Sequence, residues 1–450
     1  MKTPIYDFVR NYADSDVARF HMPGHKGRPF LGCEALDITE IDGADVLYSP
    51  SGIISESEKN ASLLFGSHHT YYSTEGSTLA IKTMLALATS DGEDERPLVL
   101  STRNAHKAFV YACALLDVDV EWIIPQARDH LCSCDITAAD LDKVIKGSHK
   151  KPRAVYVTSP DYLGNILDIS SLSSVCHSHG IPLLVDNAHG AYLAFTEPSR
   201  HPLALGADLC CDSAHKTLPV LTGGAYLHVS KSAPEEFKDI RLVRNTLSLF
   251  ASTSPSYLIL QSLDLCNRYL ADRYGEKLSS HINDLSQIKS KLSAHGYCIL
   301  PCEPLKTVID CGSYGYKGNE IAVLLRRGGI ECEFSDDEYI VFMSTPENTQ
   351  DELERLCEAL TKIPKKAPLE IAKPQGLTST PTAAISIRAA VLSHRETVSV
   401  EQAAGRICAT PTVSCPPAVP IVISGEIIKH EHTELFKFYG IDTVEVCVTK

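Results

Sequence analysis

Strand-like apolar runs alternate with helical patterns along the middle of the chain, between residues 68 and 230. This alternation predicts strand–helix–strand crossovers, and therefore an α/β fold in which helices cover both faces of a mostly parallel sheet. Ligands of such sheets bind beyond the carboxyl ends of the strands, so residues that follow a strand are the first candidates for a site. The expected strands are His69–Ser73, Leu98–Ser101, Val120–Ile124, Ala154–Thr158, Leu183–Val185, Leu209–Cys211 and Ala225–Val229, and the expected helices include Ser77–Ala88 and His106–Leu116.

The length of 450 residues allows two or three domains around at least one large core. We expect residues 1–65 to form an N-terminal segment and residues 66–300 a large ligand-binding domain. We further expect a small α/β domain over residues 301–363 and a C-terminal α+β domain over residues 376–450, after the linker Ile363–Pro368. The small domain is expected to contain the strands Val308–Asp310 and Tyr339–Ser344 and the helices Asn319–Arg327 and Gln350–Leu360.

The composition fits a globular chain, with 44% apolar and 22% charged residues. No apolar run approaches the roughly 20 residues of a membrane-spanning helix, and the N-terminus lacks the apolar core of a signal peptide. We therefore expect a cytoplasmic protein with no membrane partner. The net charge of −14 argues against a nucleic-acid partner and mildly favours cationic small molecules.

The 16 cysteines are scattered along the chain, which favours reduced thiols over a disulfide framework. His130, Cys132 and Cys134 have a spacing that resembles half of a metal site. No second Cys/His pair stands at a usual zinc spacing, so we predict no metal.

The turn Ser213-Ala214-His215-Lys216 follows one predicted strand, and Asp186 ends another. This is the combination that a pyridoxal phosphate (PLP) enzyme needs, because a lysine forms the Schiff base and a carboxylate keeps the pyridine nitrogen protonated. Ser213 and His215 are then placed to reach the phosphate while Lys216 reaches the aldehyde carbon. The sequence therefore predicts PLP as the cofactor.

A phosphate cradle is predicted where the turn Thr74–Thr78 opens a helix. Gly76, Ser77 and Thr78 combine exposed helix N-terminal amides with two hydroxyls, which suits an anion. An ordinary helix cap is the alternative interpretation. The position of this turn upstream of Asp186 and Lys216 favours the phosphate site.

Other residues near strand ends have two interpretations each. His106 either stacks on the pyridine ring or belongs to a surface turn, and Lys107 is a rival to Lys216 that lacks a preceding Ser/His pair. Ala188 leaves room for a flat ring against the strand. His189 either contacts the cofactor or substrate or only supports its turn.

Several motifs occur together in one order along the chain, and this set resembles the prokaryotic Orn/Lys/Arg decarboxylase family of fold-type I PLP enzymes. The resemblance covers nearly the whole chain, and the length is similar to that of the short arginine decarboxylase-like branch without an additional N-terminal domain. The motifs are Arg19–Gly27, Glu75–Thr78, Arg103–Lys107, Asp186–Gly190, Ser213–Lys216, Thr253–Tyr257, Ala403–Ile407, Pro416–Pro420 and Ser424–Glu426.

The resemblance implies a role for each matching residue. It implies phosphate contacts from Ser77, Thr78, Ser213 and His215, ring stacking by His106, a pyridinium partner in Asp186 and the Schiff base on Lys216. It also implies a homodimer or higher assembly with active sites at the interface. Ser252 resembles the hydroxyl that reaches a neighbour's phosphate, and Glu426 is a candidate ligand for the substrate's distal cation.

Three residues depart from the family pattern. Glu75 stands where asparagine is common, so a carboxylate near the phosphate needs a compensating donor. Asn187 replaces a frequent glutamate, and Ser424 replaces a frequent proline. These departures bear on the substrate more than on cofactor binding.

The resemblance implies decarboxylation of a basic L-amino acid, first of all arginine to agmatine, as in polyamine biosynthesis. Lysine to cadaverine and ornithine to putrescine are the next choices. An aminotransferase or aldolase of the same fold, or a catalytically silent PLP-binding homologue, remains an alternative. Lys216 or His215 supplies the proton to Cα; the sequence leaves this open.

Overall fold

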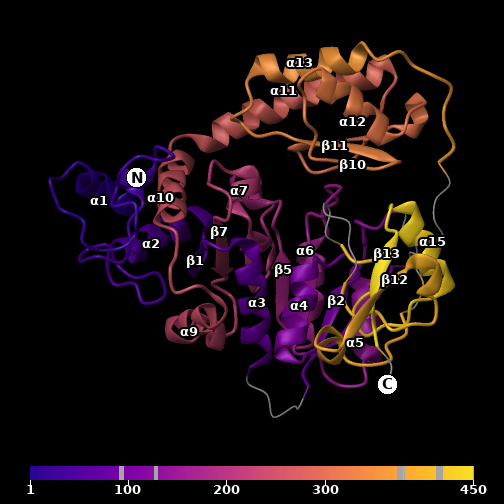
Figure 1. The fold of residues 1–450 in the computed structure, drawn as a ribbon, viewed down its shortest axis with the longest axis horizontal. Helices are drawn as coiled ribbons and strands as arrows, with labels where there is room; N and C mark the ends of the chain where they lie inside the picture. The colour runs from indigo at the N-terminus through magenta and orange to yellow at the C-terminus, as the bar shows by residue number, and fades with distance from the viewer. Residues whose placement is uncertain (91–95, 126–129, 372–378, 380, 412–418, 449–450) are drawn as a thin grey trace. The chain divides into compact units, whose positions relative to one another are not determined.

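The computed structural model describes residues 1–90, 96–125, 130–371, 379, 381–411 and 419–448. The chain divides into two compact units, and Figure 1 shows the course of their elements. The first unit comprises Met1–Glu93, Arg153–Tyr156 and Ile169–Glu276, and the second comprises Asp94–Pro152, Val157–Asp168 and Lys277–Lys450. The four-part division expected from the sequence stays a prediction.

The large sheet has the strand order β1-β7-β6-β5-β4-β2-β3. Pairs β5–β6 and β2–β3 are parallel, whereas β7 runs antiparallel to both β1 and β6. Each strand lies within one residue of its predicted bounds, so the prediction of an α/β fold with a mostly parallel sheet is confirmed. The bounds are β1 His69–Ser73, β2 Leu98–Thr102, β3 Asp119–Ile123, β4 Ala154–Thr158, β5 Leu183–Asp186, β6 Leu209–Asp212 and β7 Ala225–Val229.

Several helices of the first unit pack against the strands that it contains. Helix α3 packs against β6, β7 and α9, and nearly all of its residues after the first turn are buried. Helices α1, α2 and α10 pack on one another. The bounds are α1 Pro4–Ala13, α2 Ile53–Phe65, α3 Gly76–Thr89, α6 Ile169–Ser178, α7 Ala214–Thr217, α8 Glu235–Lys238, α9 Ile240–Phe250 and α10 Tyr257–Ala271.

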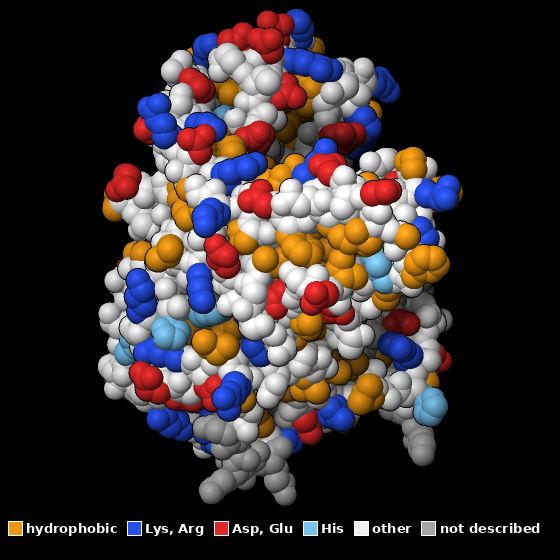
Figure 2. Space-filling model, turned by 90° about the vertical axis from the view of Figure 1, so that its left-hand side faces the viewer, with side chains coloured by type: hydrophobic (Ala, Val, Ile, Leu, Met, Phe, Trp, Pro, Cys, Tyr) orange, Lys and Arg blue, Asp and Glu red, His pale blue; other side chains and the backbone are white. Residues whose placement is uncertain are grey.

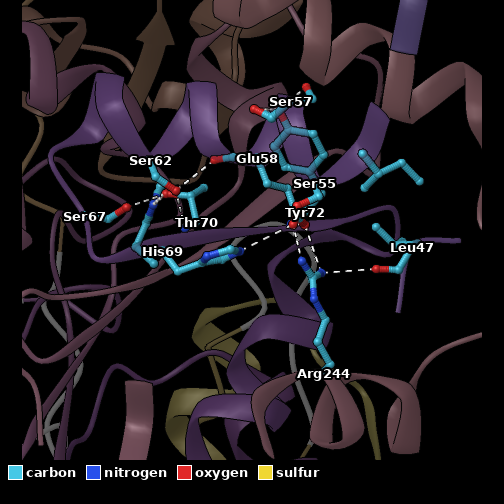
Figure 3. A network of polar contacts seen from close by, with 12 residues as sticks. Leu47, Ser55, Ser57, Glu58, Ser62, Ser67, His69, Thr70, Tyr72 and Arg244 are labelled. Carbon is cyan, nitrogen blue, oxygen red and sulfur yellow. Dashed lines mark hydrogen bonds and ion pairs between the residues drawn. The ribbon is translucent and has the colours of Figure 1, made fainter. Parts of the chain in front are cut away.

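A buried ion pair joins α2 to α9 in this unit, as Figure 3 shows. Glu58 is fully buried and forms a bidentate pair with the Arg244 guanidinium, which also donates to the Leu47 carbonyl at 3.1 Å. The backbone nitrogen of Tyr72 donates to Glu58 Oε1 at 2.9 Å, which ties β1 to the same carboxylate. Burial alone would raise the pKa of Glu58, but Arg244 and His69 hold it below its usual value.

The second unit contains an antiparallel sheet of order β10-β11-β9-β8 with a core that includes Ile309, Leu325, Ile340 and Leu360. A separate core around Phe436 includes residues of the antiparallel pair β12–β13. The elements predicted for the small domain are confirmed. The bounds are α4 Lys107–Leu116, α5 Ala138–Gly147, α11 Tyr274–His295, β8 Cys298–Leu300, β9 Lys306–Asp310, α12 Gly318–Arg327, β10 Phe334–Ser335, β11 Tyr339–Met343, α13 Gln350–Thr361, α14 Ile387–Val391, β12 Arg395–Ser399, α15 His430–Phe438 and β13 Thr443–Cys447.

The cysteines within the described ranges are all free thiols. Among the described helices, none is long and apolar enough to cross a membrane. Pro416, Pro417 and Ala418 of the tail motif lie outside the described residues.

Candidate functional site

The predicted lysine turn and the predicted aspartate come from neighbouring strands of the first unit. Strands β5 and β6 are parallel with Asp186 opposite Cys211, so Asp186 and Ser213 lie at adjacent carboxyl ends. Strand β6 runs directly into the short helix α7, which carries Lys216. Lys216 Nζ lies 2.9 Å from His189 Nε2, so His189 contacts the lysine itself.

The carboxylate of Asp186 is buried and receives hydrogen bonds from neutral donors. Tyr156 donates its hydroxyl to Oδ2 at 3.0 Å, and Oδ1 accepts the Ala188 backbone nitrogen at 3.2 Å and the Cys211 thiol at 3.5 Å. Within the described residues, no Lys, Arg or His side chain pairs with Asp186. A buried carboxylate held only by neutral donors fits a cationic partner such as a protonated ring nitrogen.

Tyr156 and Cys211 are site residues that the sequence did not reveal. Each lies inside an apolar strand, where the pattern indicates only a core residue. Their contacts with Asp186 depend on which strands are neighbours in the sheet, and the local sequence pattern does not specify strand order.

Two hydroxyls meet at the N-terminus of α3. Ser213 Oγ donates to Ser77 Oγ at 2.9 Å, Gly76 has a φ of 68°, and Thr78 on the same first turn is exposed. The Gly76 backbone nitrogen donates to the Gly223 carbonyl at 2.7 Å, and a Cβ at Gly223 would lie 3.0 Å from a backbone oxygen. Paired hydroxyls at the start of a 14-residue helix fit a phosphate.

His215 is oriented by the strand next to it. Its Nδ1 lies 3.0 Å from the Gly224 carbonyl oxygen, and its backbone nitrogen donates to the same oxygen at 3.2 Å. Because a carbonyl only accepts, Nδ1 carries the proton in this bond. Burial lowers the pKa of His215, the carbonyl opposes this, and Lys216 adds to the lowering.

Glu75, which departs from the family pattern, accepts a hydrogen bond from the backbone. Its Oε1 accepts the backbone nitrogen of Ser252 at 2.6 Å, and Ser252 Oγ accepts the Ser254 nitrogen at 3.2 Å. The carboxylate thereby anchors the exposed turn that carries Ser252. Both residues lie in the first unit, with the Ser77–Ser213 pair.

His106 and Glu426 belong to the second unit. His106 caps α4, since its Nδ1 accepts the Ala108 backbone nitrogen at 3.1 Å. Glu426 is buried and forms a bidentate pair with Arg103, at 2.8 and 2.7 Å, and its Oε2 also accepts the Ile423 nitrogen. The ring-stacking role of His106 and the substrate role of Glu426 stay predictions.

Comparisons with known proteins identify the family of this chain. The family model described as the Orn/Lys/Arg decarboxylase major domain matches residues 3–308, and the model of the C-terminal domain matches residues 372–442. Arginine decarboxylase of Bacillus subtilis (strain 168) is 30% identical, over 96% of this chain and 92% of that protein. Arginine decarboxylase of Halalkalibacterium halodurans is also 30% identical, over 95% of this chain and 91% of its own length.

Among solved structures, the lysine decarboxylase LdcF of Francisella novicida has the same fold, with a TM-score of 0.82 at 16% identity. The alignment covers 99% of this chain and 81% of that one. The sequence-based prediction of family and enzyme class is therefore confirmed: the chain belongs to the Orn/Lys/Arg decarboxylase family.

Proposed function

We propose that this protein uses PLP to decarboxylate L-arginine to agmatine. The observation that carries the proposal is the arrangement of Lys216, Asp186 and the Ser77–Ser213 pair in one unit, at the carboxyl ends of neighbouring strands and the start of α3. This set offers an amine, a carboxylate and an anion cradle, which are the three groups that PLP requires of a protein.

The residues of this chain that would hold PLP are assigned from their chemistry. Lys216 would bond to the aldehyde carbon, Asp186 would face the ring nitrogen, and Ser77 and Ser213 would bind the phosphate. When bound, PLP supplies an electron-accepting ring for the electron pair left at Cα as carbon dioxide departs. Tyr156 and Cys211 donate to the Asp186 carboxylate and would orient it toward the ring nitrogen.

We assign proton delivery to Cα to Lys216, and His189 exchanges protons with the lysine. The two nitrogens are 2.9 Å apart, so a proton can pass from one to the other. The Nδ1 proton of His215 is engaged by the Gly224 carbonyl, and this makes His215 a positioning group in our proposal.

Arginine is preferred as substrate because the full-length relatives at 30% identity are named arginine decarboxylases. Lysine is the second candidate, since a lysine decarboxylase of Pseudomonas aeruginosa is 22% identical over 60% of this chain. Ornithine is third, from the family description. The carboxylate of Glu426 faces Arg103 here, so a substrate cation would have to compete with that guanidinium.

We also propose that the protein works as a homodimer. Large apolar side chains are exposed in the first unit, and Figure 2 shows hydrophobic groups gathered on the side where α1 and α2 lie. Monomers rarely expose apolar patches of this kind without a partner. The exposed residues include Phe20, Met22, Phe30, Leu31 and Leu63. Sedimentation of the purified protein tests this proposal, and a monomeric mass at micromolar concentration would contradict it.

The activity is tested by incubating the PLP-loaded protein separately with arginine, lysine and ornithine. Carbon dioxide and the amine product are measured together. We expect release with arginine and agmatine as the product. A yellow protein that releases carbon dioxide from none of the three would contradict the proposed reaction while leaving the PLP site in place. A keto acid or aldehyde without carbon dioxide would instead indicate an aminotransferase or aldolase.

A further inference from the structure

Asp212, the last residue of β6, lies at the centre of a fully buried polar cluster. Its Oδ2 is 3.0 Å from His201 Nε2 and 3.0 Å from His228 Nε2. Its Oδ1 accepts the Asn187 side-chain amide at 2.6 Å and the Cys210 thiol at 3.8 Å. All five side chains are at most 1% exposed. None of these contacts belongs to the reaction assigned above.

The hydrogen bonds fix the state of the cluster. His201 Nδ1 accepts the Leu203 backbone nitrogen, so its Nε2 carries the proton and donates to Asp212. His228 Nδ1 lies 2.8 Å from Thr70 Oγ1, a hydroxyl that can donate to it. Both histidines can thus be neutral while Asp212 is ionised. Burial disfavours this charge, but the two histidines lower the pKa of Asp212 below its usual value. The donors occupy both carboxylate oxygens, so the cluster is complete without an ion.

Asn187 connects this cluster to the proposed cofactor site. It directly follows Asp186, and its carbonyl accepts the Gly190 nitrogen at 2.8 Å, so it opens the turn that carries Ala188 and His189. Within the described residues, its side-chain oxygen makes no hydrogen bond. The hydrogen bond from its amide nitrogen to Asp212 is therefore the polar anchor of this side chain.

Asp212 also directly precedes Ser213, and the Asn187 backbone nitrogen donates to the Cys211 carbonyl at 2.9 Å. The Asn187–Asp212 side-chain bond thus joins the ends of β5 and β6 in addition to this backbone bond and to the Cys211 thiol on Asp186. One strand end presents Asp186 and His189, and the other presents Ser213 and Lys216.

We propose that Asp212, held by His201 and His228, is a positioning residue that sets the Asn187–Gly190 turn through Asn187 and thereby sets the affinity for PLP. This inference deepens the proposed function and rests on it. At metal sites, removing a residue that orients a ligating group typically costs about tenfold or more in affinity, and we expect an effect of that size here.

The experiment measures the PLP dissociation constant of the apoprotein by absorbance titration for wild type, Asp212→Asn, Asn187→Ala and the double variant. In Asp212→Asn, an amide nitrogen replaces one carboxylate oxygen. It then faces either the two histidine Nε2 atoms or the Asn187 amide nitrogen, all of which need an acceptor. We expect a weakening of about tenfold for each single variant and little further loss in the double variant, because both remove the same anchor. Additive losses would overturn the route through Asn187.

The matched control is Asp208→Asn. Asp208 is also buried and also bonds a histidine, His177 at 2.9 Å, but it precedes β6, at the opposite end of the strand from Lys216. Urea unfolding of both variants separates stability from affinity. We expect both to lose stability and Asp212→Asn alone to lose PLP affinity. Equal PLP affinities in Asp212→Asn, Asn187→Ala and wild type would overturn the inference, as would an equal loss in Asp208→Asn. A wild-type protein that binds no PLP would overturn the proposed function, and this inference with it.

Discussion

The hydroxyl of Tyr156 donates a 3.0 Å hydrogen bond to Oδ2 of Asp186, and 30 positions of sequence separate the two residues. Tyr156 lies in β4 and Asp186 ends β5, which is the next strand in the sheet. The bond fixes the direction of the Asp186 carboxylate. Its effect can be measured because a tyrosine hydroxyl can be removed without changing the ring.

Tyr156→Phe should weaken PLP binding and slow turnover. A buried carboxylate oxygen that loses its donor costs about 1–3 kcal/mol, which corresponds to roughly fivefold to 160-fold in the affected constant. PLP titration and the rate of carbon dioxide release measure the two effects. Tyr297→Phe is the control, since that buried hydroxyl donates to the Leu360 carbonyl in a core of the second unit. Equal losses in the two variants would remove Tyr156 from the site.

Lys216→Ala should abolish turnover and the visible absorbance of covalently bound cofactor, because it removes the amine that lies beside His189 and would form the Schiff base. Lys107→Ala, which removes the rival lysine at the start of α4, should retain both. Absorbance spectra and carbon dioxide release decide between the two lysines. Normal turnover in Lys216→Ala would refute the assignment.

Glu75→Ala should weaken PLP binding by about fivefold, since it removes a hydrogen bond of about 1 kcal/mol that anchors the Ser252 turn. Glu75→Gln keeps an acceptor oxygen for the Ser252 nitrogen and removes a negative charge from the vicinity of the phosphate turn. It should bind PLP at least as tightly as wild type. If Glu75→Ala and Glu75→Gln bind PLP with equal affinity, the hydrogen bond from Ser252 to Glu75 has no role in PLP binding.

Arg244→Met should lower the free energy of unfolding by about 3–5 kcal/mol, because it leaves the Glu58 carboxylate buried without its cation. The control is Arg273→Met, which breaks an exposed pair with Glu276 and should change the free energy of unfolding little, because water screens such a pair. Urea denaturation measures both variants at the same protein concentration. Similar losses of unfolding free energy in the two variants would show that burial of the Glu58–Arg244 pair does not contribute to stability.

Asp264 should make stability depend on pH. Its Oδ2 accepts the backbone nitrogens of Ile5 and Tyr6 at the start of α1. Burial raises the pKa of Asp264 to about 6, although hydrogen bonds oppose this. The unfolded value is about 3.9, so the native state binds this proton more tightly. The free energy of unfolding therefore falls, by roughly 3 kcal/mol, as the pH rises from about 4 to about 6.

Asp264→Asn removes this titration, while its amide oxygen can still accept the two backbone hydrogen bonds. The unfolding free energy of the variant minus that of wild type should then increase between about pH 4 and pH 7. Urea denaturation across this range measures the difference. A difference that stays constant with pH would mean that Asp264 does not titrate there.

The sequence alone determined the strands of the large sheet, the elements of residues 306–361 and the residues that end those strands. Apolar runs bounded by turns placed β1 to β7 within one residue, and Asp186 and Lys216 were found because each follows such a run. The family also followed from the sequence, because its motifs are short runs of residues in a fixed order. All of this information is local, since an apolar run, a turn and a motif depend on neighbours along the chain.

The tertiary structure decided the contacts that give those residues their properties. Tyr156 and Cys211 meet Asp186, and Asn187 meets Asp212, only because β4, β5 and β6 are adjacent in the sheet. Glu426, expected from the sequence to face a substrate, is paired with Arg103, 323 positions earlier. Such contacts depend on strand order and side-chain packing over long separations, and no local pattern of residues specifies them.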